Sequence, residues 1–170
     1  MIRNGGFEIH TSLDSTLQTQ LQAGIDETLA KFTDVSENGK YALQGAAVCI
    51  DNRTGYVVAI SGGRGTDDEY NRGFLSRRQP GSTIKPLIDY APAFETGYYY
   101  PSRIVNDHLF DKGPKNSGNK YYGEVSVREA LNRSLNTVAW QVLADIGVDY
   151  GTSYLDKMHF VGLSYLDNWN

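Results

Sequence analysis

The sequence has almost no cysteine, no long hydrophobic run and no excess of positive charge. Its single cysteine, Cys49, excludes an internal disulfide, and we expect it to be a small hydrophobic residue in a strand. No apolar run approaches the roughly 20 residues that span a membrane, and Met1–Gly6 shows no signal peptide. The net charge of −4 argues against nucleic acid or an anionic membrane as a partner. We therefore expect a soluble chain without a membrane segment.

The length of 170 residues and a hydrophobic content of 40% are enough for one globular domain with a core. The acidic run Asp67-Asp68-Glu69 follows a glycine-rich stretch. Its spacing matches no metal-ligand pattern, so we expect a solvated loop and predict neither a metal site nor a cofactor.

Chemistry is indicated first at Gln79–Pro86, which reads Gln-Pro-Gly-Ser-Thr-Ile-Lys-Pro. Pro80-Gly81 breaks the preceding structure, and Ser82 is a residue that often starts a helix. In a helix Ser82 and Lys85 lie on one face, within reach of each other. A serine hydroxyl needs a base to become a nucleophile, and a partly buried lysine with a lowered pKa can be that base. The free N–H groups of a helix start suit a substrate oxyanion.

A Ser-x-x-Lys pattern is weak evidence alone, because about one copy is expected by chance in a chain of this length. A second copy, Ser117–Lys120, lies in the loop-like stretch 112–120 and starts no predicted helix. We interpret that copy as chance. From local context, Ser82 is as well explained by an ordinary helix cap as by a nucleophile.

The first half of the chain shows strand and helix patterns. Phe7–Thr11 alternates apolar and polar residues, as an edge strand does. A helix over 14–31 is predicted, capped by Asp14 and with leucine or isoleucine at every fourth position. The apolar runs Ala46–Ile50 and Tyr56–Ile60 flank a turn and predict a β-hairpin.

The second half reads as mainly helical. The Ser82 helix should run to about Glu95, where Gly97 ends it, with a kink or break at Pro92. A region at 98–110 is aromatic and irregular. Ser126–Ile146 predicts a single helix closed by Gly147, followed by a helix at 152–160 and a loop at 161–170.

A second pattern lies in the long helix, at Ser134-Leu135-Asn136. Ser-x-Asn also occurs at Ser36–Asn38 and Ser117–Asn119, and two polar residues on a helix need no function. The surrounding sequence is more specific. Residues 121–137 resemble the second motif region of class A penicillin-binding proteins, and Gln79–Pro86 resembles their first motif.

The resemblance covers nearly the whole chain with its motifs in order. Pro114-Lys115-Asn116 also fits, as do the opening stretch 6–29 and the hairpin with Asp51 and Gly55. It implies an α+β fold of the penicillin-binding and serine β-lactamase type. In this chain we expect a truncated form, with the helical part and the N-terminal strands of the antiparallel sheet.

The resemblance further implies the transpeptidase domain of a peptidoglycan synthase, which acts on D-alanyl-D-alanine stem peptides and is acylated by β-lactams. By position, Ser82 would be the nucleophile and Lys85 its base, while Ser134 relays a proton. Asn136 would bind the substrate carbonyl and help hold Lys85, and the N–H of Ser82 would be half of an oxyanion hole. The parent protein would act outside the cytoplasmic membrane.

One family feature has no counterpart, namely the third motif, Lys-Thr/Ser-Gly. The nearest imitation, Arg53-Thr54-Gly55, precedes Ser82 and lies in the predicted hairpin turn, so we reject it. We therefore expect residues 1–170 to be a partial transpeptidase domain, inactive or weakened, which self-associates through an exposed sheet edge. A serine β-lactamase and a non-catalytic interaction module remain alternatives.

Overall fold

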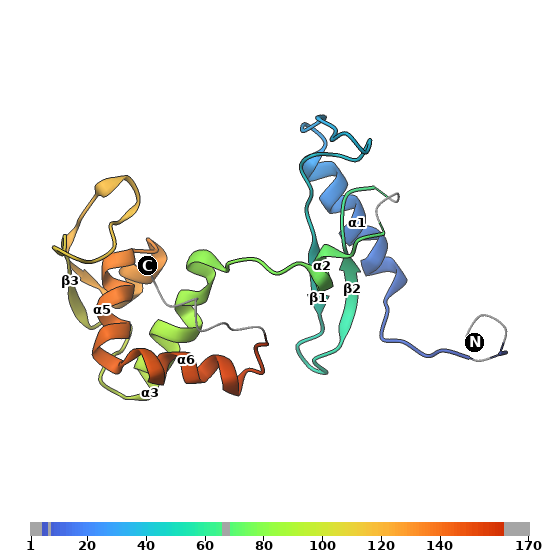
Figure 1. Ribbon diagram of the computed structural model, residues 1–170. Coiled ribbons are helices and arrows are strands. Elements are labelled where there is room, and N and C mark those ends of the chain that lie inside the picture. Colours follow the sequence, from blue (N-terminus) through green and yellow to red (C-terminus); the bar gives the residue numbers. More distant parts are fainter. Residues whose placement is uncertain (1–4, 7, 66–68, 162–170) are drawn as a thin grey trace. The chain divides into compact units, whose positions relative to one another are not determined.

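A computed structural model describes residues 5–6, 8–65 and 69–161 of the chain (Figure 1). Helices and short antiparallel strands confirm the α+β class. The chain packs as two compact units, residues 1–78 and 79–170. Of the predicted acidic loop only Glu69 is described. The predicted C-terminal loop lies outside the described residues except for Val161.

The first unit contains the predicted helix α1 (Ser15–Leu29), which begins at its predicted cap. The Asp14 carboxylate accepts the backbone N–H groups of Thr16 and Leu17, each at 2.9 Å. These two bonds satisfy donors that the first turn of a helix leaves free.

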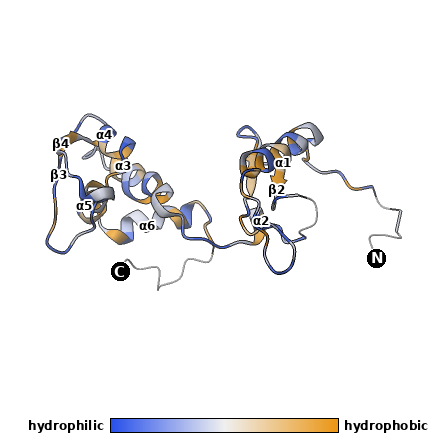
Figure 2. Cartoon of the chain, turned by 90° about the horizontal axis from the view of Figure 1, so that it is seen from above, coloured by the Kyte–Doolittle hydropathy of each residue, from blue (hydrophilic) through white to orange (hydrophobic). Residues whose placement is uncertain are grey.

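The predicted hairpin is also present, as β1 (Ala47–Ile50) paired antiparallel with β2 (Val57–Ser61). The strand β2 is hydrophobic along most of its length and packs against α1 (Figure 2). Gly55 closes the turn at a φ of +74°, which glycine adopts without strain. Cys49 lies half-buried in β1, and the short helix α2 (Arg72–Leu75) follows the hairpin.

The predicted edge strand Phe7–Thr11 is wrong for its described residues, 8–11, which form no strand and are exposed. The chain instead reaches β2 just before α1. Ser12 Oγ donates to the carbonyl of Val57 at 2.6 Å, and Asp14 N donates to that of Val58 at 2.8 Å. Two single bonds hold this segment without making a strand ladder.

The outer edge of β2 is closed by a side chain of α1. Gln18 donates to the Ile60 carbonyl at 3.0 Å and accepts the Ile60 N–H at 2.9 Å. Since Ile60 pairs with Val48, the Val48 N–H and carbonyl point away from β2. Among the described residues, the open edge of this hairpin is therefore that of β1.

The second unit begins with three helical segments where one helix was predicted. They are the 3₁₀ helix η2 (Gly81–Ile84), the π-helix η3 (Pro86–Tyr90) and the α-helix α3 (Ala91–Glu95). Pro86 and Pro92 have no N–H to donate, so a regular α-helical ladder cannot run through them. The helix type changes after Ile84 and again after Tyr90, so the predicted break lies before Pro92. Gly97 lies just beyond the end of α3, as predicted.

A second two-stranded sheet was not predicted. β3 (Ile104–Asp107) pairs antiparallel with β4 (Gly123–Ser126), so the region at 98–110 is only partly irregular. Between the strands, the predicted loop carries one 3₁₀ turn, η4 (Ser117–Asn119).

The single helix predicted over Ser126–Ile146 is wrong, because two helices replace it. These are α4 (Val127–Asn132), capped by the Ser126 hydroxyl, and α5 (Asn136–Ile146). Gly147 ends α5 as predicted, and α6 (Val148–Lys157) begins earlier than predicted.

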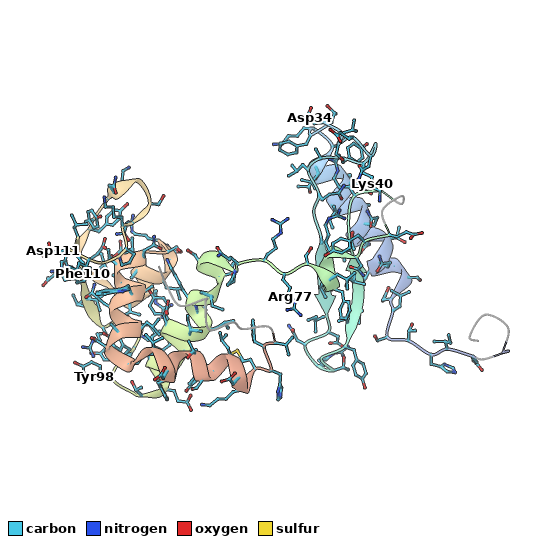
Figure 3. The ribbon with its side chains drawn as sticks, in the orientation of Figure 1. Asp34, Lys40, Arg77, Tyr98, Phe110 and Asp111 are labelled. Atoms are coloured by element: carbon cyan, nitrogen blue, oxygen red, sulfur yellow. The ribbon has the colours of Figure 1, made fainter. Side chains whose placement is uncertain are left out.

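Helix α5 lies at the centre of the hydrophobic core of the second unit. Phe110 packs on its outer side, with its ring 4.9 Å from that of Trp140 (Figure 3). The main buried cluster consists of Tyr90, Ala93, Tyr99, Val125, Val127, Ala130, Leu135, Val138, Ala139 and Val142.

Helix α6 approaches η3 so closely that only glycine fits at 151. A Cβ there would lie 2.5 Å from the Ile88 carbonyl oxygen and 2.5 Å from Leu143 Cδ1. We expect Gly151→Ala to lower the free energy of unfolding by about 1–3 kcal/mol in urea denaturation, because a backbone atom cannot move aside cheaply. This loss outweighs the gain in helix propensity of at most about 1 kcal/mol.

The matched control is Gly24→Ala in α1, where a new Cβ has no neighbour within 4 Å. It should show the propensity gain alone. If both variants were stabilised equally, α6 would not be packed on η3 as the structure places it.

Candidate active site

The four residues singled out in the sequence lie on two segments of the second unit. Ser82 belongs to η2, and Lys85 follows directly at its end. Ser134 lies in the turn between α4 and α5, and Asn136 is the first residue of α5.

Lys85 joins the two segments. Its side chain is buried, with 6% of the residue exposed. Nζ donates to the Ser134 carbonyl at 2.8 Å, to the Ser134 hydroxyl at 3.2 Å and to Asn136 Oδ1 at 2.5 Å. All three partners are uncharged, so the site satisfies the amine without fixing a counter-ion beside it.

Burial lowers the pKa of Lys85, and the nearby carboxyl of Asp89 acts in the opposite direction. Asp89, on η3, is buried in turn, and burial raises its pKa to about 7 although Lys85 lowers it. Its Oδ1 has no hydrogen-bond partner among the described residues. Burial therefore favours the uncharged form of both groups, which increases the fraction of neutral lysine.

Ser134 adopts a left-handed backbone conformation, with a φ of +54°. Its N–H donates to the Leu131 carbonyl, and the Leu135 N–H donates to the Ala130 carbonyl, which closes α4. Helices often end in this conformation, but usually with glycine, and a serine there costs about 1–3 kcal/mol. The turn presents both the carbonyl and the hydroxyl of Ser134 to Lys85.

The orientation of the Asn136 amide is determined from both sides. Its Nδ2 donates to the Lys115 carbonyl at 2.8 Å, while Oδ1 accepts from Lys85 Nζ. A carbonyl requires the NH₂ end and an amine donor requires the oxygen end, so the reversed amide would lose both bonds.

Ser82 lies on the same short segment as Lys85 and is exposed. It is not the cap of a long helix, since η2 begins at Gly81 and ends at Ile84. Within the part of the chain that the structure describes, its hydroxyl makes no hydrogen bond to Lys85. The structure thus brings Lys85, Ser134 and Asn136 into contact and leaves Ser82 open to solvent beside them.

The sequence copies of these motifs lie elsewhere. Ser117 is the first residue of the short turn η4 and Lys120 follows it, and both are exposed. Arg53-Thr54-Gly55 lies in the turn of the first unit's hairpin, as predicted.

Among the residues that the structure describes, no three His, Cys, Asp or Glu side chains gather as metal ligands would. None of their helices has the length and apolar character needed to cross a membrane.

Sequence reasoning missed Asp89 and gave no role to Lys115 or Asn116. Asp89 reads as an ordinary polar residue in a helix, and nothing local signals its burial. The stretch Pro114-Lys115-Asn116 carries a signal only through the family resemblance.

Residues 45–166 match the family model described as the penicillin binding protein transpeptidase domain. Because this match covers well over half of the chain, the chain belongs to the family of penicillin-binding protein transpeptidase domains.

Among curated relatives, penicillin-binding protein 1A of Clostridium perfringens strain 13 is 35% identical over 179 residues. That match covers 95% of this chain and 26% of the relative, so the chain spans about a quarter of the length of such proteins. It is also similar to solved structures. Penicillin-binding protein 1A from Haemophilus influenzae is 30% identical with a TM-score of 0.61, over 74% of this chain and 21% of that one.

The PonA1 protein from Mycobacterium tuberculosis, solved in complex with penicillin V, has a TM-score of 0.71 at 22% identity. The match covers 96% of this chain and 42% of that one. At this identity the similarity shows the fold alone. The predicted fold of the penicillin-binding type is therefore confirmed.

Proposed function

We propose that this chain carries the serine acyl-transfer site of a cell-wall synthase, which cross-links peptidoglycan stem peptides and is acylated by β-lactams. The observation that supports this proposal is the buried Lys85, held by the Ser134 and Asn136 oxygens beside the exposed Ser82. A buried lysine whose hydrogen-bond partners are uncharged oxygens is suited to act as a general base.

The three partners of Lys85 suit either protonation state of the amine. The Ser134 carbonyl and Asn136 Oδ1 can only accept, whereas the Ser134 hydroxyl can accept or donate. A neutral amine has two N–H groups for the two obligatory acceptors, and its lone pair then faces a hydroxyl proton. When protonated, it donates to all three. A proton can thus arrive and leave with little rearrangement.

In the proposed reaction the lone pair of Lys85 turns from the Ser134 hydroxyl to the Ser82 hydroxyl and takes its proton as Ser82 Oγ bonds to the substrate carbonyl carbon. The carbonyl oxygen becomes an oxyanion, for which the Ser82 N–H is one donor. The C–N bond to the leaving D-alanine or opened β-lactam nitrogen then breaks. Ser134 passes the proton from Lys85 to that nitrogen, and Asn136 binds the peptide carbonyl. An acceptor amine completes transpeptidation by the reverse steps.

We further propose that residues 1–170 form part of a transpeptidase domain that acts outside the cytoplasmic membrane. The printed sequence holds no Lys-Thr/Ser-Gly motif after Asn136. In the family, the strand that carries this motif would add substrate carboxylate recognition and a second oxyanion donor. We therefore expect these 170 residues alone to react weakly with β-lactams or not at all.

A fluorescent penicillin and denaturing gels test the proposal on the full reading frame that encodes these residues. A stable covalent label is the expected result. Rapid loss of the label would indicate a β-lactamase instead, and a full-length protein that takes no label would indicate a non-catalytic module. Either result would overturn the proposal.

We also propose that the 170-residue chain self-associates through β1, whose Val48 is 42% exposed with outward N–H and carbonyl groups. Light scattering over a concentration series should show a rising mass. Val48→Pro should abolish the rise without breaking the hairpin, because the removed N–H is not used by β2.

The control is Ala59→Pro, within β2. Ala59 pairs with Cys49 next to the outward-facing Ile60–Val48 pair, so its N–H faces β1, and its loss should unfold the hairpin rather than only change the mass. A wild-type chain that stays monomeric at all concentrations would contradict self-association.

A further inference from the structure

The first N–H groups of α5 are capped by a residue from a distant loop. Asn116 Oδ1 accepts the N–H of Asn136 at 2.7 Å and that of Thr137 at 3.3 Å. The residue at the usual cap position, Leu135, makes no such bond. Asn116 is 5% exposed, so this cap is buried.

Asn116 is itself held by a buried carboxylate at the end of β3. Its Nδ2 donates to Asp107 Oδ1 at 2.7 Å, and Asp107 is 1% exposed. The Thr137 hydroxyl donates to the same oxygen, and the Tyr122 N–H donates to Asp107 Oδ2 at 2.9 Å. A carboxylate accepts from all three, which requires the NH₂ end of Asn116 to face it. The oxygen end of Asn116 must then face α5.

Consecutive loop residues thus hold both the backbone and the side chain of Asn136. Asn116 binds its N–H, and the Lys115 carbonyl binds its Nδ2. The remaining polar atom of the side chain, Oδ1, contacts Lys85 Nζ. An ordinary helix cap would require only the first of these contacts.

We propose that Asp107 and Asn116 are positioning residues, which hold Asn136 against Lys85 and so keep the proposed base buried and in a fixed position. This inference rests on the proposed function, since it assigns the two residues to the acyl-transfer site. They do not touch the reacting atoms. They act through Asn136, from the end of β3 and from the loop that follows it, both outside the two motif segments.

Asn116→Ala and Asp107→Asn test the proposal in the full reading frame. The first removes the acceptor for the α5 N–H groups. The second puts an NH₂ group either against Asn116 Nδ2 or against the Tyr122 N–H, so one of the bonds that hold this cluster is lost in either orientation. We expect the second-order rate of acylation by fluorescent penicillin to fall about 10²-fold in each, the scale of a small misplacement of a catalytic group.

The pH profile separates positioning from stability. Acylation requires neutral Lys85, so its rate rises with pH through the pKa of Lys85. Of the charged groups, Asp89 acts on Lys85 from its own segment, and its contacts from α5 and the preceding turn are neutral. A loosened Asn136 admits water to Lys85, which raises its pKa, so both variants should shift the rising limb to higher pH.

Ser117→Ala is the matched control, since Ser117 is exposed and next to Asn116. This variant should keep the wild-type rate of acylation and the wild-type position of the rising limb of the pH profile. If Asn116→Ala and Asp107→Asn lowered only the melting temperature, with rate per folded enzyme and pH limb unchanged, the residues would be structural and the proposal overturned.

A second measurement does not depend on acylation. Carbon-13 NMR of Lys85 Cε in the 170-residue chain reports its titration directly, and an Asn116→Ala chain should titrate at higher pH. If the pKa of Lys85 rose in the Asn116→Ala chain but the full-length protein took no penicillin label, the positioning role would be supported and the proposed function would fail. Unchanged titration in a labelled protein would overturn positioning alone.

Discussion

Ser82→Ala is expected to abolish covalent labelling by β-lactams in the full reading frame, a loss of about 10⁴-fold or more in acylation rate. The exposed turn at Gly81–Ile84 carries two hydroxyls, and that of Thr83 donates to the Pro80 carbonyl at 2.6 Å, which leaves the Ser82 hydroxyl as the candidate nucleophile. Alanine removes it without filling space and without disturbing the contacts of Lys85 with Ser134 and Asn136. Mass spectrometry of the protein after exposure to penicillin measures the loss as the missing acyl adduct.

Ser117→Ala is again the control, because Ser117 starts the chance copy of the motif. Its variant should label like the wild-type protein. An acyl adduct that persists after Ser82→Ala would show that another residue is the nucleophile.

Lys85→Arg is expected to reduce acylation by about 10²–10⁴-fold, the usual contribution of a general base. Guanidinium keeps the positive charge and can still donate to the Ser134 carbonyl and to Asn136 Oδ1. It stays protonated, however, and cannot accept the proton of Ser82. Circular dichroism should therefore show little change in fold, whereas stopped-flow acylation should be slow.

The pH dependence adds a second criterion. Because burial lowers the pKa of Lys85, the wild-type rate should rise with pH below the range of an exposed lysine. That limb should be absent from Lys85→Arg. The exposed Lys112 supplies the control, as Lys112→Arg should leave rate and limb unchanged. A Lys85→Arg protein that acylates normally would place the base elsewhere.

Local signals were sufficient to predict α1 and the first hairpin. Asp14 forms the cap that its position predicts, and the apolar runs on either side of the turn at 51–55 form β1 and β2. In each case the determining contacts lie within a few residues. The strands β3 and β4 were not predicted because they are short and pair across 15 intervening residues, 108–122.

The break between α4 and α5 had no local signal either. Apolar residues continue with helical spacing through Leu131, Leu135 and Val138, because both helices pack against one core. The turn at Ser134 is therefore invisible to periodicity. Its cause is tertiary, since α5 starts where Asn116 caps it.

The candidate site was predicted in its motif residues and not in its supports. Ser-x-x-Lys and Ser-x-Asn, read with their surroundings, selected Lys85, Ser134 and Asn136, which the structure brings together. Asp107 and Asn116 carry no such pattern. Their function depends on contacts with residues 20 to 30 positions away, which only the folded chain creates.

Two requirements conflict at Ser134: its left-handed backbone favours glycine, whereas the contact with Lys85 uses a side-chain hydroxyl. Selection for a robust fold favours glycine there, as would a designer who chose residues for the backbone alone, because glycine removes the steric penalty. Glycine would also keep the carbonyl that Lys85 uses, and would lose only the hydroxyl. A lineage released from the need for proton transfer is therefore expected to drift to glycine at 134 while its fold persists. The identity of this one residue would therefore distinguish domains that keep acyl-transfer activity from domains that have lost it.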